Sequence, residues 1–149
     1  MNIPVVTRPI AGQYESIMIA VLCEGAMTAG DVVQWSDTAS ATYPLGIAVE
    51  DSVAGDGRVA GVMVDTVAAG QYGLCQIYGY NTNITTDGAV AATDLFLAAG
   101  AAVAVGETNA EVNADITTAN YLGLKDVFAW NISVDVGTVG QGFIAVMGA

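Results

Sequence analysis

The apolar residues of this chain come in short runs, each ended by glycine, proline, aspartate or asparagine. The longest run is Ile17–Cys23, which lies between Glu15 and Glu24. Short apolar or alternating runs between turn residues are typical of β-strands, whereas an amphipathic helix needs a longer pattern. The 149 residues suit a single domain. We therefore expect an all-β protein, a compact sandwich or small barrel of short strands.

Turn residues divide the chain into expected strands. These cover residues 17–22, 32–35, 45–49, 59–67, 73–79, 121–125, 127–130, 132–136 and 141–147. The Gly-Asp-Gly sequence at 55–57 predicts a tight hairpin turn just before the strand at 59–67. The Asp87-Gly88 pair predicts a second hairpin, formed by the residues on either side of it.

Residues 89–105 have a mixed pattern. Their alanines favour a helix, but Gly100 interrupts the run, and Val103 and Val105 are β-branched. We expect two strands joined near Ala99 and Gly100. Thr108 and Glu111 have the three-residue spacing of a capping box, which favours the start of a helix within residues 109–121. One short helix at most is expected there.

The first twelve residues differ from the rest. Pro4 and Pro9 restrict the backbone on either side of a short Val-Val-Thr segment, which favours an extended arm. We expect residues 1–12 to form this arm and residues 13–149 to form one β-rich domain. An extended stretch such as Ile3, Pro4, Val5 and Val6 is able to add a strand to a neighbour's sheet. We expect it to contact another chain; a frayed terminus is the alternative.

The charge of the chain excludes several classes of partner. Its 15 acidic and 3 basic residues give a formal net charge of −12. Nucleic acids and anionic membranes are bound by clustered cations, so neither is expected as a partner. The N-terminal sequence has no signal-peptide pattern, and no apolar run is long enough for a membrane span. Synthesis in the cytoplasm is the expectation.

The chain contains no histidine, which removes the usual general base and the commonest metal ligand. Asp37 is followed by Thr-Ala, and Asp65 is followed by Thr-Val. These two aspartates are the candidates for a carboxylate-dependent hydrolase, but neither is in an Asp-Thr/Ser-Gly motif. Glu50, Asp51 and Asp56 lack the spacing of a calcium loop. We expect no enzyme activity, catalytic residue, cofactor or metal site.

Two cysteines, Cys23 and Cys75, lie in apolar contexts without a CxxC motif. Buried free thiols are expected, although a disulfide between them is the open alternative. Three aromatic residues, Trp35, Tyr78 and Tyr80, are candidates for an interface with another protein or another subunit. Tyr78 and Tyr80 share the alternation that places side chains on one face of a strand. Core packing is an equally good interpretation of all three.

The surface is unusually poor in charge. A folded monomer of this size exposes about 7,000 Å², over which only 18 charged side chains (15 acidic and 3 basic) are distributed. Neutral surface of this extent tends to be covered by partners, while the acidic part keeps particles apart. The composition therefore favours a structural protein in a permanent assembly.

Four sequence segments resemble those of the capsid decoration proteins of tailed bacteriophages, also called cement or head-stabilising proteins. They are residues 29–33 (Ala-Gly-Asp-Val-Val), 45–49 with 54–56, 93–97 with Gly100, and 122–124 (Leu-Gly-Leu). Two positions depart from the family pattern: Thr93 replaces a usual glycine, and Lys125-Asp126 interrupts an apolar strand.

The resemblance implies a virion protein of the outer capsid surface. Such proteins bind the major capsid protein, often as homotrimers, and cement neighbouring capsid subunits against internal pressure. A tail or fibre component is the alternative, and a hydrolase is a more distant one. The resemblance brings no catalytic residues.

Overall fold

The computed structural model describes residues 15–37, 47–52, 58–86, 94–99, 104–108, 127–132 and 139–146. Within these ranges the chain forms nine β-strands and no helix, so the all-β prediction is confirmed. The strands are β1 (Ile17–Cys23), β2 (Val32–Trp35), β3 (Ala48–Asp51), β4 (Val59–Met63), β5 (Tyr72–Thr85), β6 (Asp94–Ala99), β7 (Ala104–Thr108), β8 (Val127–Asn131) and β9 (Val139–Ala145).

The first five strands close into a barrel. Their order is β1-β3-β2-β4-β5, and β5 pairs again with β1. The contact of β1 with β3 is parallel, while the remaining pairs of the barrel are antiparallel. Closure leaves these strands without a long open edge. The small barrel, rather than the sandwich, is therefore the form of the expected all-β fold.

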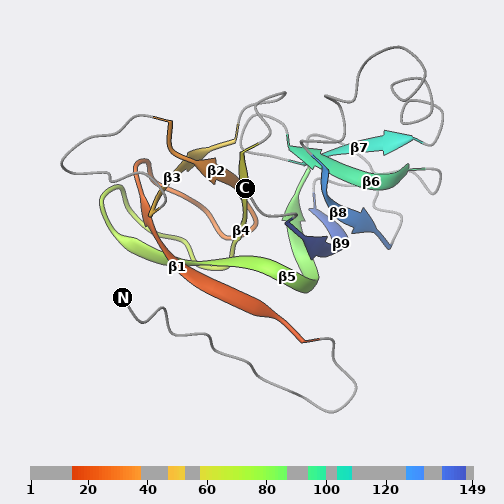
Figure 1. Ribbon diagram of the computed structural model, residues 1–149, viewed down its shortest axis with the longest axis horizontal. Coiled ribbons are helices and arrows are strands. Elements are labelled where there is room, and N and C mark those ends of the chain that lie inside the picture. The colour runs from red at the N-terminus through yellow and green to blue at the C-terminus, as the bar shows by residue number, and fades with distance from the viewer. Residues whose placement is uncertain are drawn as a thin grey trace.

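Strand β5 is shared between the barrel and a second sheet region. Its first half pairs with β1 and β4, and from Tyr78 onwards it pairs with β9. The sheet then continues through β8 and β6 to β7. Figure 1 shows the barrel strands β1 to β4 on one side and β6 to β9 on the other, with β5 running between them.

Gly79 lies where β5 leaves the barrel. Its φ is +105°, and a Cβ atom there would clash with the carbonyl oxygen of Glu15. The backbone of β1 is therefore able to approach β5 closely only because this residue has no side chain. A register irregularity between Ile17 and Met18 marks the same place on β1.

Two apolar cores lie on opposite faces of β2 and β4. One contains Val21, Cys23, Met27, Val33, Val49, Ala60, Met63 and Cys75. The other joins the barrel to the second sheet region and contains Val32, Val59, Val62, Ile84, Leu97, Ala99, Ala129 and Ile144. Because neighbours such as Val32 and Val33 point into different cores, β2 and β4 are buried on both faces.

The structure corrects the first predicted hairpin. Strand β2 lies between β3 and β4, so the strands on either side of residues 55–57 are not paired with each other. Burial against a strand distant in the sequence prevails there over the local turn signal. The second hairpin stays a prediction, because Asp87-Gly88 and residues 89–93 lie outside the described residues.

Strands β6 and β7 confirm the two strands expected on either side of Gly100. They pair in antiparallel fashion, with Ala99 opposite Ala104. The expected arm at 1–12, the short helix at 109–121 and the strand at 121–125 lie outside the described residues, as does all but the first residue of the strand at 132–136.

Candidate interaction surface

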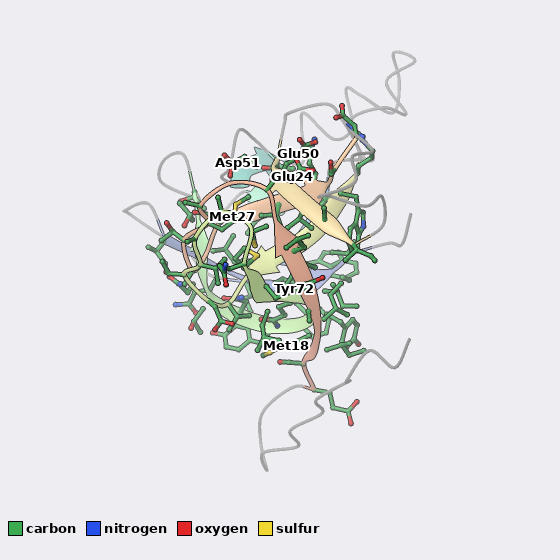
Figure 2. All side chains as sticks on the ribbon, turned by 90° about the vertical axis from the view of Figure 1, so that its left-hand side faces the viewer. Met18, Glu24, Met27, Glu50, Asp51 and Tyr72 are labelled. Atoms are coloured by element: carbon green, nitrogen blue, oxygen red, sulfur yellow. The ribbon has the colours of Figure 1, made fainter. Side chains whose placement is uncertain are left out.

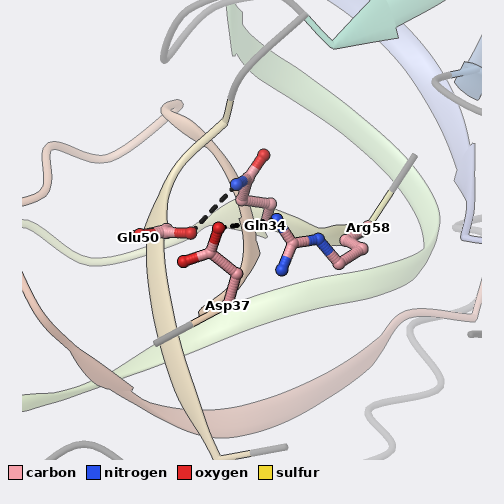
Figure 3. Close-up of polar contacts among 4 residues, drawn as sticks. All are labelled: Gln34, Asp37, Glu50 and Arg58. Carbon is pink, nitrogen blue, oxygen red and sulfur yellow. Dashed lines mark hydrogen bonds and ion pairs between the residues drawn. The ribbon is translucent and has the colours of Figure 1, made fainter. Parts of the chain in front are cut away.

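The two aspartates considered for a hydrolase have separate structural partners. Asp37 forms an exposed ion pair with Arg58, with 3.2 Å between Oδ2 and Nη2 (Figure 3). Asp65 accepts a hydrogen bond of 3.1 Å from the backbone N–H of Leu74. An ion pair and a turn contact of this kind account for both carboxylates without a shared proton.

A group of carboxylates lies at one end of the barrel. Glu50 and Asp51 end β3, and the backbone N–H of Glu24 donates to the carbonyl of Val49 beside them (Figure 2). Burial raises the pKa of Asp51, and the charges of Asp31 and Glu50 raise it further. Glu50 also accepts a hydrogen bond from the Gln34 amide (3.0 Å; Figure 3). Among the described residues, no group of three or more potential ligands is arranged to hold a metal ion.

The two cysteines lie free and buried in the barrel core, as expected. Burial raises the pKa of both thiols, and in Cys75 the neighbouring Cys23 adds to the effect. Thiols in such surroundings stay protonated, so they are poor nucleophiles and poor metal ligands. Neither cysteine offers a reactive site.

The structure separates the three aromatic residues that the sequence singled out. Trp35 is partly buried and packs against the barrel core. Tyr78 is 41% exposed, and its ring meets that of Phe143 edge-on, with centroids 5.0 Å apart. Tyr80 donates a hydrogen bond of 2.6 Å to Oε1 of Gln141. The other four candidates, Ile3, Pro4, Val5 and Val6, lie outside the described residues.

Tyr78 and Tyr80 belong to a face formed by three adjacent strands, which we call the aromatic face. Tyr80 on β5 is opposite Phe143 on β9, which in turn is opposite Trp130 on β8. Directly opposed residues share a face of a sheet, so the three rings form a row across the strands. The aromatic face consists of Tyr78, Tyr80, Trp130, Ile132, Val139, Gln141 and Phe143.

Alternation along β9 explains why these side chains point outward. Gly140, Gly142 and Ile144 are buried on the opposite face, where Ile144 joins the second core. Val139, Gln141 and Phe143 alternate with them and lie on the aromatic face. Trp130, Ile132 and Val139 are 48%, 52% and 44% exposed, so bulky apolar side chains meet solvent here.

The aromatic face carries no charged side chain. The acidic side chains that the structure describes belong to the barrel strands and the segments next to them, namely Glu15, Glu24, Asp31, Asp37, Glu50, Asp51 and Asp65. By register the row continues from Trp130 to Phe96 on β6 and then to Glu107 on β7, where an acidic residue ends it. Exposed aromatic and apolar side chains grouped in this way are typical of a protein contact surface.

A hollow of about 230 Å³ adjoins this face, with Tyr80, Asn81 and Asn83 in its lining. It is smaller than the ~300 Å³ at which ligand pockets usually begin. The Gln76 amide that lines it already donates to the carbonyls of Tyr78 and Tyr80 and accepts from Asn81. These contacts give the hollow a structural role.

Sequence reasoning missed Trp130, Ile132, Val139, Gln141 and Phe143 as members of this surface. The signal that was available is the alternation of 139–145, in which glycines occupy every inward position before Ile144. Which strands adjoin β9 is a long-range property that this alternation does not contain.

Within the described ranges, no helix has the length and apolar character needed to cross a membrane. No model of a known protein family matches the sequence, and no curated protein matches it. Among solved structures, the chain is similar to the N base of the head fiber protein gp8.5 of bacteriophage phi29. The TM-score is 0.52 at 12% sequence identity, and the match covers 90% of this chain and 98% of the fiber base. At this identity the likeness shows a shared fold.

Proposed function

We propose that this protein is a structural component of a tailed-phage particle that binds the outer surface of the capsid. Its partner in this role is the major capsid protein, and the protein has no catalytic activity. The observation that carries the proposal is the shared fold, which extends over 98% of the base of a phage head fiber. A fold that forms the base of a phage head fiber is suited to the same kind of location in another phage.

The sequence and the surface support this role independently. The resemblance of four segments to capsid decoration proteins points to the same location. The exposed apolar side chains of the aromatic face suit a protein that is covered by a partner on this side. In the proposed role, homotrimers bridge neighbouring capsid subunits, and many copies together resist internal pressure.

The fiber-base fold favours a second candidate function. In that case the domain would anchor a further structure on the head without reinforcing the shell. Both candidates place the protein on the capsid, but only the first predicts that its binding stabilises the particle.

The test uses purified protein and heads of the encoding phage that lack it. We expect co-sedimentation with expanded heads and added density on their outer surface in electron microscopy, with unexpanded heads as the control. Cementing predicts that decorated heads release DNA at a higher temperature than bare heads. Binding without this increase would support the fiber-base function, and absence of binding to any head would refute the proposal.

A further inference from the structure

The outer side of the barrel carries another exposed apolar surface, on the paired strands β1 and β5 (Figure 1). We propose that this surface binds an uncharged oligosaccharide. Such binding goes beyond the proposed function, because it gives the barrel a ligand of its own, separate from the contact with the capsid.

Alternation along β1 and β5 defines this surface. Cys23 and Cys75 point into the barrel core, so the even-numbered residues beside them point outward. Ala20 is opposite Leu74 in the register, and directly opposed residues share a face of a sheet. We call this surface the β1–β5 face. It consists of Met18, Ala20, Leu22, Val64, Tyr72 and Leu74.

The face presents an aromatic ring and aliphatic side chains to solvent. Tyr72 is 64% exposed, Leu74 is 37% exposed, and Ala20 is exposed between them and β3. A pyranose ring has one face of C–H groups, which packs on an aromatic ring, and hydroxyl groups at its rim. Tyrosine matches both, because its ring is apolar and its hydroxyl group forms hydrogen bonds.

The hollow of about 230 Å³ adjoins the same face, because Met18 and Val64 line it. Its lining also contains the hydroxyl groups of Ser16 and Thr82 and the side-chain amide of Asn83, and the last two residues are exposed. Hydroxyl and amide groups donate and accept hydrogen bonds, as the hydroxyl groups of a sugar do. The hollow is smaller than a pocket for a drug-sized ligand, which suits a single sugar unit.

The two parts of the face are far enough apart for a chain of sugars. Tyr72 and Gln76, which lies in the lining of the hollow, are four residues apart on β5. This corresponds to about 13 Å along the strand. Leu74 lies between them. One sugar unit in the hollow and another on the Tyr72 ring would therefore belong to an oligosaccharide.

Charge selects an uncharged ligand. Asp65 borders the face, since its Oδ2 atom accepts a hydrogen bond from the backbone N–H of Leu74. Arg58, the basic side chain within the described ranges, is paired with Asp37 instead. Nucleic acids and acidic glycans need clustered cations, which the described part of this face does not offer.

The pairing of the barrel strands points to the same face. In the oligonucleotide/oligosaccharide-binding fold, the strands follow the order first, second, third, fifth and fourth around the barrel, and the third and fifth are parallel. Ligands bind on the face of the second and third strands. The order β4-β5-β1-β3-β2 matches this arrangement, with β1 and β3 as the parallel pair. The chain is a circular permutation of it, in which β5 and β1 take the places of the second and third strands.

The test uses the purified full-length chain without phage heads. Binding is measured on an array of uncharged glycans, namely glucans, mannans, galactans and N-acetylglucosamine oligomers, and affinities follow from calorimetry. Polygalacturonate and a single-stranded oligonucleotide are the anionic probes. Tyr72→Ala removes the aromatic ring, and Thr82→Val removes a hydroxyl group from the hollow. Tyr78→Ala is the matched control, because it removes the same side chain from the same strand outside this face.

We expect wild type to bind at least one uncharged glycan and neither anionic probe. Tyr72→Ala should weaken this binding at least tenfold and Thr82→Val at least threefold, while Tyr78→Ala stays within twofold of wild type. Circular dichroism checks that the variants fold. Should Tyr72→Ala fail to fold, Thr82→Val decides the outcome.

Absence of binding to every uncharged glycan, preference for an anionic probe, or equal losses in Tyr72→Ala and Tyr78→Ala would overturn the inference. If wild type binds no glycan and Tyr72→Ala weakens binding to heads, the face is a protein contact and the inference is wrong. Because the glycan assay contains no heads, its failure leaves the proposed function intact. Failure to bind heads likewise leaves a glycan result unchanged.

Discussion

The side-chain amide of Asn81 donates a hydrogen bond of 2.9 Å to Oε1 of Gln76, which is buried. The Gln76 Nε2 atom in turn donates to the backbone carbonyls of Tyr78 and Tyr80, each at 3.2 Å. These bonds span the part of β5 where pairing changes from β1 and β4 to β9. The buried amide therefore holds the strand in shape between the barrel and the aromatic face.

Replacing Gln76 by leucine should destabilise the fold by about 1–3 kcal/mol, because two partly buried carbonyl oxygens lose their donor. Urea unfolding followed by circular dichroism measures this loss. Gln71→Leu is the matched control, since Gln71 is exposed, and its stability should stay within about 0.5 kcal/mol of wild type. Equal stability of the two variants would show that the amide contributes nothing beyond its volume.

Gly79→Ala should destabilise the protein by about 2 kcal/mol or more. The positive φ is unfavourable for alanine, and its Cβ would clash with the Glu15 carbonyl oxygen. Gly25→Ala is the control, because a Cβ there meets the Met27 methyl group at an ordinary 3.7 Å. Thermal unfolding of both variants separates the loss of a required glycine from the general effect of adding a methyl group.

How much of the fold the sequence predicts depends on how local the signal is. The runs at Ile17–Cys23 and Val32–Trp35 predict strands well because alternation and turn residues are local. The sequence prediction for β5 covered residues 73–79, but the strand continues to Thr85 through Asn81 and Asn83, which favour turns. The side-chain amide of Asn81 is satisfied within the fold, because it donates to Gln76 and accepts from the backbone N–H of Asn83.

The candidate site shows the same limit. The prediction that Tyr78 and Tyr80 share a face is confirmed by their register with β9. That Phe143 and Trp130 complete the row follows only from long-range strand pairing. Phe143 is directly opposite Tyr80, 63 positions earlier in the chain, and Trp130, 50 positions after Tyr80, is opposite Phe143. The hairpin predicted at residues 55–57 is wrong for this reason, since turn residues identify a reversal of the chain but not the strand with which it pairs.

Asp51 makes stability depend on pH. Its pKa is raised in the folded protein by burial and by Asp31 and Glu50, so the folded state holds this proton more tightly than the unfolded state. Stability from this group is present in full below the unfolded pKa of about 3.9 and is lost as pH rises through the raised folded pKa.

Asp51→Asn removes this dependence. The variant should match wild type at low pH and exceed it at neutral pH by less than about 1 kcal/mol, because the side chain is exposed. Urea unfolding at several pH values measures the difference. Salt near 1 M should reduce it, since the Debye length falls to about 3 Å. A difference that is constant across pH would assign the effect to something other than ionisation.

The buried thiols of Cys23 and Cys75 should be inert in the native protein. Because burial raises both pKa values, neither forms the reactive thiolate at neutral pH, and a thiol reagent such as dithionitrobenzoate has no access to a fully enclosed sulfur. Native protein should show less than about a tenth of the reaction rate seen in 6 M guanidinium, where both cysteines react.

In the unfolded chain the thiols ionise above about pH 8.5 while the folded chain keeps its protons, so stability should decline as pH rises beyond that value. Replacing both cysteines by alanine should remove this alkaline decline at the cost of packing in the barrel core, whereas fast labelling of the native wild type would mean that the barrel opens readily around these residues.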